Sequence, residues 1–113
     1  RVRVSTQVLQ DAVRRVSLLS NKVSPVQVNV DSESNIMTLM TNSQDIGNAQ
    51  ETLLCEIEGE SVDIAFNYSF MLDGLSVIKS DEVFLDLFGS MKPGILRTTN
   101  GENFLYLIMP VRV

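Results

Sequence analysis

The chain has 113 residues, of which 44% are apolar and 20% are charged, a balance typical of one globular domain and unlike that of a disordered segment. It contains no histidine and one cysteine, which excludes a Ser-His-Asp triad, a Cys-His pair, a histidine metal site and an internal disulfide. The net charge of −5 argues against tight DNA binding by this chain alone, because that affinity comes mainly from lysine and arginine on phosphates.

Other features of the sequence indicate the cellular environment of the chain and the protein to which it belongs. No apolar run reaches the roughly 18 residues of a membrane-spanning helix, so we expect no membrane partner. The lone Cys55 is expected to be a small buried hydrophobe, which fits a reducing, cytoplasmic setting. We expect no metal or other cofactor. Because the sequence begins at Arg1 in a strand-like Arg-Val-Arg-Val, we interpret residues 1–113 as one domain cut from a longer protein.

The first half of the chain predicts a strand, a helix and three more strands. Val2 and Val4 alternate with arginines, which is typical of a half-buried strand. Ser5 or Thr6 can cap a helix in which the apolar residues from 8 to 19 form one stripe, with Leu18 lying off that stripe. Alternation and polar breaks then predict strands at 26–30, 36–41 and 52–57, with a turn at 31–35 and a loop at 42–48.

The second half repeats this order. Patterning predicts a strand at 62–67, a helix at 69–79, and strands at 83–87, 95–98 and 104–109. Gly74 either weakens the second helix by about 1 kcal/mol relative to alanine or lets another element approach closely. The continuous apolar run from 104 to 108 predicts a last strand buried on both faces, which Pro110 ends.

Together these elements predict an α+β fold. Two tandem β-α-β-β-β units would join their three-stranded meanders, with two helices packed on one side of an antiparallel sheet and solvent on the other side. The identity between the two units is negligible, so the repeat rests on the pattern of elements alone.

The pattern favours binding over catalysis. Phe70 and Val77 lie off the inner stripe of the second helix, Met91 lies in a loop, and the tail from Met109 is apolar. Exposed apolar patches of this kind usually mark protein–protein sites. Among the carboxylates, Glu56 and Glu58 share one face of a strand, which leaves a small carboxylate-based hydrolase as a third class beside a solvated strand face.

Several segments resemble one family, the bacterial sliding clamps, which are the beta subunits of DNA polymerase III. The resemblance is to the third, C-terminal domain and spans essentially the whole chain. It is carried by 12–21 (Ala-Val-Arg-Arg-Val-Ser-Leu-Leu-Ser-Asn), by 64–67 (Ile-Ala-Phe-Asn) with 72–75 (Leu-Asp-Gly-Leu), and by 106–113 (Tyr-Leu-Ile-Met-Pro-Val-Arg-Val). The Met-Pro-x-Arg-apolar ending is the most specific of these.

The resemblance implies a non-catalytic processivity factor with the DNA-clamp fold. In that family, two protomers of three domains each form a head-to-tail ring around duplex DNA, with helices lining the hole. The DNA polymerase III alpha subunit, the clamp loader and other clients insert a Gln-x-x-Leu-Phe-like peptide into a hydrophobic pocket between the second and third domains. Matching positions here are Phe70, Met91, Leu107, Met109, Pro110, Val111 and Arg112.

The resemblance also implies two further contact sets. The dimer interface would include Leu18, Leu19, Asp45 and Glu51, although Gly47, Asn48 and Gln50 stand where some relatives carry acidic residues. DNA would be met loosely and without sequence preference by Arg14, Arg15, Lys22 and Lys79. The competing interpretation is a generic α+β protein- or ligand-binding module of an unrelated protein, and two helices side by side with the tail at one edge would favour the clamp.

Overall fold

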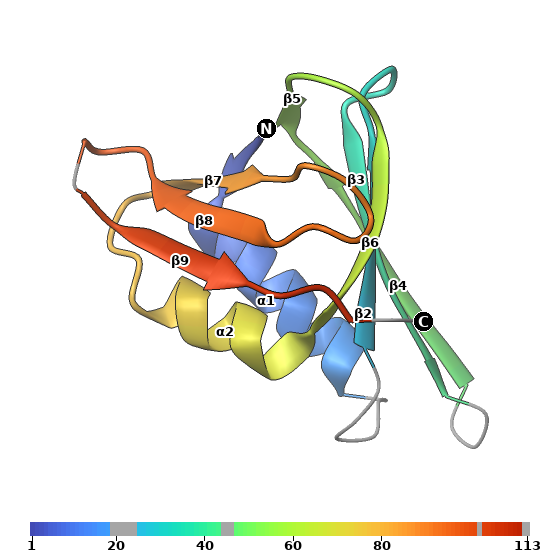
Figure 1. Cartoon of the computed structure of the whole chain (residues 1–113). Coiled ribbons are helices and arrows are strands. Elements are labelled where there is room, and N and C mark those ends of the chain that lie inside the picture. Colours follow the sequence, from blue (N-terminus) through green and yellow to red (C-terminus); the bar gives the residue numbers. More distant parts are fainter. Residues whose placement is uncertain (19–24, 44–46, 102, 112–113) are drawn as a thin grey trace.

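The structure is a computed structural model that describes residues 1–18, 25–43, 47–101 and 103–111 (Figure 1). The elements in chain order are β1 (Val2–Ser5), α1 (Thr6–Ser17), β2 (Pro25–Asp31), β3 (Ile36–Ser43), β4 (Gly47–Leu54), β5 (Glu56–Ile57), β6 (Val62–Asn67), α2 (Tyr68–Ser76), β7 (Glu82–Asp86), β8 (Gly94–Thr98) and β9 (Leu105–Ile108).

The strands form two antiparallel sheets. A five-stranded sheet has the order β5-β1-β7-β8-β9, and a four-stranded sheet has the order β4-β3-β2-β6. The α+β class and the tandem units are confirmed, but the two meanders do not join in one sheet. Instead, β1 of the first unit pairs with β7, and β6 of the second unit pairs with β2. The first strand of each unit, β1 or β6, therefore belongs to the sheet of the other unit, which we call the exchange of first strands. Pairing between units cannot be read from local patterning, so the sequence did not reveal it.

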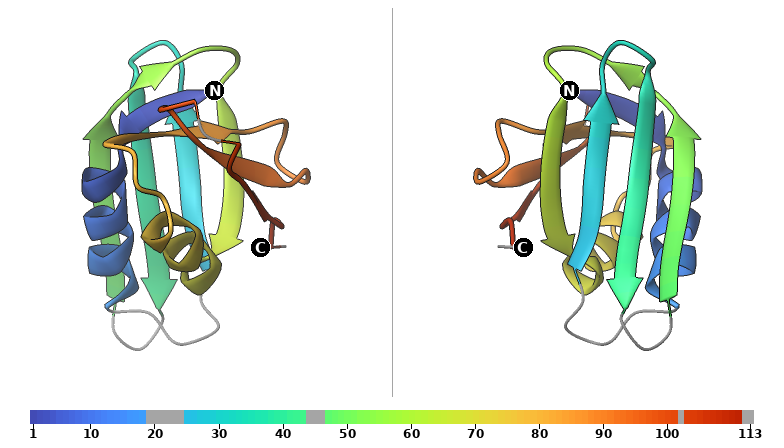
Figure 2. Two further views of the ribbon diagram at one scale, coloured as in Figure 1. Left: turned by 90° about the vertical axis from the view of Figure 1, so that its left-hand side faces the viewer. Right: turned by 90° about the vertical axis from the view of Figure 1, so that its right-hand side faces the viewer.

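The two helices lie side by side on one face of the four-stranded sheet, and no helix of the part of the chain that the structure describes lies on the opposite face (Figure 2). The Ser5 hydroxyl accepts a hydrogen bond of 3.3 Å from the Val8 amide, which caps the start of α1 as expected. The buried residues Leu9, Val13 and Val16 form the predicted inner stripe, but Val8, which was expected on it, is 47% exposed at the first turn of the helix. Within the described residues no helix is long and apolar enough to cross a membrane.

The core lies between the helices and the two sheets. Inward residues of β2, β3 and β6 pack with those of α1, α2, β7 and β8 into one apolar cluster. A Cβ on Gly94 of β8 would lie 2.8 Å from the ring of Phe66 on β6, so the small residue lets the two sheets approach. Cys55 is half-buried at the edge of this cluster, and burial raises the pKa of its thiol to about 11.

Three predicted boundaries were wrong. In the predicted loop 42–48, the described residues 42–43 and 47–48 are strand, because Asn42 pairs with Asn48 and Ser43 with Gly47, whereas residues 44–46 lie outside the described residues. The strand at 52–57 is interrupted at Cys55, after which β5 leaves β3 and pairs with β1. The second helix ends at Ser76 rather than at 79.

The last strand is not buried on both faces as predicted. Leu105 and Leu107 are 55% and 56% exposed. The reason is that β9 is an edge strand whose one face packs on α2 through Tyr106, whereas no element covers the outer face among the described residues. A continuous apolar run therefore does not distinguish a central strand from an edge strand that presents an apolar face.

Candidate functional site

The tail after β9 connects the two sheets. It leaves the five-stranded sheet and runs along β6, the edge strand of the four-stranded sheet (Figure 1). Pro110 forms an isolated bridge with Phe66, and the Val111 amide donates to the Ala65 carbonyl at 2.8 Å. Met109 nevertheless remains 59% exposed. The tail is therefore held in place by its backbone while it presents an apolar side chain to solvent.

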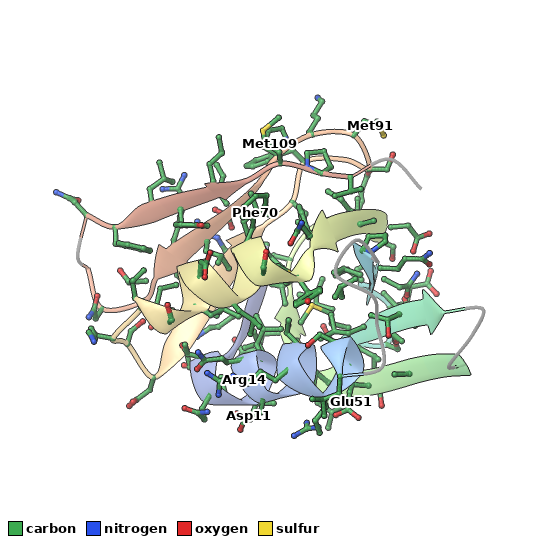
Figure 3. All side chains as sticks on the ribbon, turned by 90° about the horizontal axis from the view of Figure 1, so that it is seen from below. Asp11, Arg14, Glu51, Phe70, Met91 and Met109 are labelled. Atoms are coloured by element: carbon green, nitrogen blue, oxygen red, sulfur yellow. The ribbon has the colours of Figure 1, made fainter. Side chains whose placement is uncertain are left out.

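The first turn of α2 lies beside this tail. Asn67 caps the helix through its side-chain oxygen. This oxygen accepts a hydrogen bond of 2.9 Å from the Ser69 amide and one of 2.6 Å from the Ser69 hydroxyl. This cap fixes the turn that carries Phe70, which is 52% exposed. Figure 3 shows Phe70, Met91 and Met109 on the same side of the molecule, with Met91 in the segment between β7 and β8.

Two of the predicted pocket residues line a hollow of about 460 Å³. Met91 and Val111 line it, whereas Phe70, Leu107 and Met109 lie exposed outside its lining and Pro110 is half-buried beside β6. The full lining consists of Gln27, Val28, Asn29, Met40, Asp63, Ile64, Ala65, Ser90, Met91 and Val111. Arg112, the last predicted pocket residue, lies outside the described residues.

Sequence reasoning missed the sheet side of this hollow. Gln27, Asn29, Met40 and Asp63 occupy outward positions on β2, β3 and β6, opposite the buried positions of the same strands. Outward residues of a strand normally form a plain solvated face, and no local signal distinguished these from others. Only the fold shows that the loop carrying Met91 and the tail border this part of the sheet.

The predicted dimer residues that the structure describes lie at the end of α1 and on β4, which packs against this helix. Leu18 is 79% exposed and directly follows the helix. Glu51 on β4 accepts from the Arg15 guanidinium, with Nε and Nη2 at 2.8 and 2.6 Å from Oε1. A residue expected at the dimer contact and one expected to meet DNA therefore pair with each other. Leu19 and Asp45 lie outside the described residues.

The predicted DNA-facing cations differ in how firmly they are held. Arg14 is exposed, and its nearest carboxylate oxygen, from Asp11, is 3.9 Å from Nη1 (Figure 3). Lys79 is also exposed, after α2. Lys22 lies outside the described residues. Arg14 is thus more available for an outside anion than Arg15, which Glu51 holds.

A separate ion cluster lies on the outer face of the five-stranded sheet. Asp86 accepts from Arg1 Nε at 2.8 Å and from Arg97 Nε at 2.9 Å. Burial alone would raise the pKa of Asp86, but the hydrogen bonds and positive charges of the two arginines outweigh it and lower the pKa below its ordinary value. The Arg1 guanidinium also lies 4.2 Å from the centre of the Phe84 ring. This cluster joins β7 to β8 and to Arg1, the residue before β1.

The described residues offer little for catalysis. They contain no group of three or more acidic, cysteine or histidine side chains that could hold a metal ion. Glu56 and Glu58 are both exposed, without the burial that tunes a carboxylate for proton transfer. The raised pKa of Cys55 keeps its thiol protonated near neutral pH, which is the unreactive form.

Curated relatives resemble nearly the whole chain. The Beta sliding clamp of Streptomyces coelicolor is 35% identical over 116 residues, covering 97% of this chain and 30% of the relative. The Beta sliding clamp of Staphylococcus aureus is 33% identical over 102 residues, covering 89% of this chain and 27% of the relative. The chain therefore spans less than a third of the length of these proteins.

Solved structures agree in fold. The DNA polymerase sliding clamp from Bacillus subtilis has a TM-score of 0.92 at 32% identity, covering 99% of this chain and 30% of that one. The DNA polymerase III beta subunit from Thermotoga maritima has a TM-score of 0.92 at 31% identity, with the same coverage. The family model of the DNA polymerase III beta subunit, C-terminal domain, matches residues 1–112. The chain therefore belongs to the DNA polymerase III beta subunit family, in which it matches the C-terminal domain.

Proposed function

We propose that this chain is the third domain of a ring-shaped sliding clamp that encircles duplex DNA and tethers a DNA polymerase to it. The domain would have no catalytic role and no cofactor, and it would act in the cytoplasm as part of a longer, three-domain protein. The observation that carries the proposal is the tail at Met109 to Val111, which is bound to β6 through its backbone and leaves Met109 exposed on the same side of the molecule as Phe70 and Met91.

In the proposed clamp, the tail forms one half of a pocket for client peptides. Exposed apolar side chains on a fixed backbone favour this role, because they are ordered before binding and bury apolar surface when a Leu-Phe pair is inserted. Leu107, Pro110 and Arg112 belong to the same proposed site by their positions in the chain. The clients would be the polymerase III alpha subunit, the clamp loader and other proteins with a Gln-x-x-Leu-Phe-like motif.

The helix layer and the end of α1 support the proposed ring. Two helices lie side by side on one face, as a DNA-lining layer requires, and Arg14 and Lys79 are exposed beside them. A sequence-independent ring needs no tight contact, so the net charge of −5 is compatible with encircling DNA. We place the head-to-tail dimer contact at Leu18, Leu19, Asp45 and Glu51.

The peptide site is tested by titrating the full-length protein with a fluorescent Gln-Leu-Ser-Leu-Phe peptide, read by polarisation, with Leu-Phe→Ala-Ala as the control peptide. We expect specific binding with a Kd of about 10 μM to 1 mM, or roughly −7 to −4 kcal/mol. Met109→Ala should raise this Kd about tenfold or more, because an exposed anchor in a peptide pocket carries much of the binding energy.

The matched control is Leu54→Ala, which truncates a side chain that is 85% exposed on β4, away from the tail. It should leave the Kd unchanged. Deleting the last five residues is a less specific test, because it also removes the bridge to Phe66 and the hydrogen bond to Ala65. Equal affinity of the wild type and Met109→Ala, or equal binding of the two peptides, would contradict the proposed site and leave a generic binding module as the alternative.

A further inference from the structure

We propose that Asp63 and the hollow beside it bind a basic residue of the client peptide, so that clients with a lysine or arginine next to the apolar motif bind preferentially. This inference rests on the proposed function, because it assumes that a peptide is held at the tail. It assigns a specificity role to a part of the sheet surface that lies outside the predicted pocket residues.

The hollow extends from the tail onto the outer face of the four-stranded sheet. Its wall consists of Met91 and Val111, and its floor consists of paired residues of β2, β3 and β6. Gln27 stands between Met40 and Ala65 in the strand register, and the next outward pair is Asn29 with Asp63. A peptide seated against Val111 therefore reaches Asp63 within a few residues of the contact, because adjacent outward positions lie about 7 Å apart along a strand.

Charge selects the occupant of this hollow. Asp63 is the only charged residue in the described lining. Its Oδ1 accepts from the Asn29 side-chain amide, which orients the carboxylate, and Oδ2 has no hydrogen-bond partner within the described residues. A positively charged group therefore completes the site, whereas a phosphate would be repelled.

The apolar part of the lining fits the stem of a basic side chain. Met40, Met91 and Val111 form apolar parts of the hollow that Asp63 also lines. Lysine and arginine pack their methylene groups on such surface while the charged end reaches a carboxylate, and methionines adapt to different stems. Because Asp63 is exposed, the ion pair would be weak and would select among clients rather than hold them.

The experiment uses the full-length protein and four extended peptides. Two of them extend Gln-Leu-Ser-Leu-Phe with a lysine, one with Lys-Gly at the N-terminus and the other with Gly-Lys at the C-terminus. The other two are their matched controls, in which glutamine replaces the lysine. Kd values are measured by polarisation for the wild type, for Asp63→Asn and for the control Glu33→Gln. Both substitutions remove one negative charge, but Glu33 lies exposed in the β2–β3 turn, outside the hollow.

We expect one of the two lysine peptides to bind the wild type about two- to fivefold more tightly than its glutamine control. This ratio should fall to about one in Asp63→Asn, persist in Glu33→Gln and shrink in 0.5 M salt, because salt screens an exposed pair of charges. The unextended peptide should bind all three proteins equally, which shows that each variant is folded.

Two results would overturn the inference alone: no lysine preference at either end, or a preference that survives Asp63→Asn. In both cases the unextended peptide still binds and distinguishes Leu-Phe from Ala-Ala, so the proposed function stands. Failure of the unextended peptide in the wild type would instead remove the proposed function, and this inference would fail with it.

Discussion

Asp86 joins β7 to the residue before β1 and to β8 through one carboxylate. Its side chain is 10% exposed, whereas those of Arg1 and Arg97 are each 42% exposed. Removing the charge leaves two arginines without their partner, and solvent screens part of that loss. We therefore expect Asp86→Asn to lower the free energy of unfolding by about 1–2 kcal/mol at neutral pH, measured by urea unfolding.

The pH dependence of this effect has a definite sign. The pKa of Asp86 is lower in the folded chain than its ordinary value of 3.8. A lowered folded pKa means that the stabilisation is complete above the unfolded pKa and is lost as the pH falls through the folded pKa. The difference between the wild type and Asp86→Asn should therefore be constant above about pH 5 and shrink in more acid solution.

Arg14 and Arg15 are neighbours with different surroundings. A carboxylate oxygen of Glu51 lies 2.6 Å from Nη2 of Arg15, whereas the carboxylate oxygen paired with Arg14, from Asp11, is 3.9 Å from Nη1. In the proposed ring, Arg14→Ala should weaken DNA binding and reduce the slope of log K against log salt by about one unit, as expected for one lost phosphate contact. Arg15→Ala should have a smaller effect. A larger effect of Arg15→Ala on the measured salt slope would contradict this assignment.

At the level of elements, Gly74 sets the distance between α2 and β9. A Cβ at this position would lie 2.6 Å from Cδ1 of Tyr106 and 2.8 Å from Cδ1 of Leu96. The second of the two roles expected from the sequence, a close approach, is therefore confirmed. Because Phe70 is one turn away on the same helix, this approach also keeps it beside the tail.

We expect Gly74→Ala to destabilise the chain. Alanine adds about 1 kcal/mol of helix propensity, but overpacking against Tyr106 and Leu96 costs about 1–3 kcal/mol. Urea unfolding should show a net loss, and Tyr106→Leu should restore part of it when combined with Gly74→Ala, because the ring causes the closest clash. A net gain in stability from Gly74→Ala alone would mean that the helix moves away at no cost.

Most elements were predictable because their causes are local. The stripe of α1 from Leu9 onward, the cap at Ser5 and the alternation in β2 depend on neighbouring residues, and the structure confirms them. The exchange of β1 and β6 between the sheets depends on contacts between distant residues, which local patterning does not contain. The hollow near Asp63 was missed for the same reason, since its wall and floor come from separate parts of the chain.

At the scale of the whole molecule, the end of α1 is the proposed contact with a second protomer. Leu18→Ala combined with Leu19→Ala should raise the dimer Kd of the full-length protein about tenfold or more, because exposed apolar anchors dominate such interfaces. Sedimentation at low concentration measures this shift. Val8→Ala, at the other end of the same helix and 47% exposed, is the matched control. A sedimentation profile that does not change in the double variant would count against the proposed interface.

The exchange of first strands has a consequence for how the chain folds. Val2 pairs with Leu85, and Val28 pairs with Ile64, so each half of the chain needs a strand from the other half to complete its sheet. Each half therefore completes the burial of its core only when the other half is present. Such distant pairings make folding slow compared with that of helical bundles. They also make it concerted, so that loss of either sheet exposes the core of both halves at once.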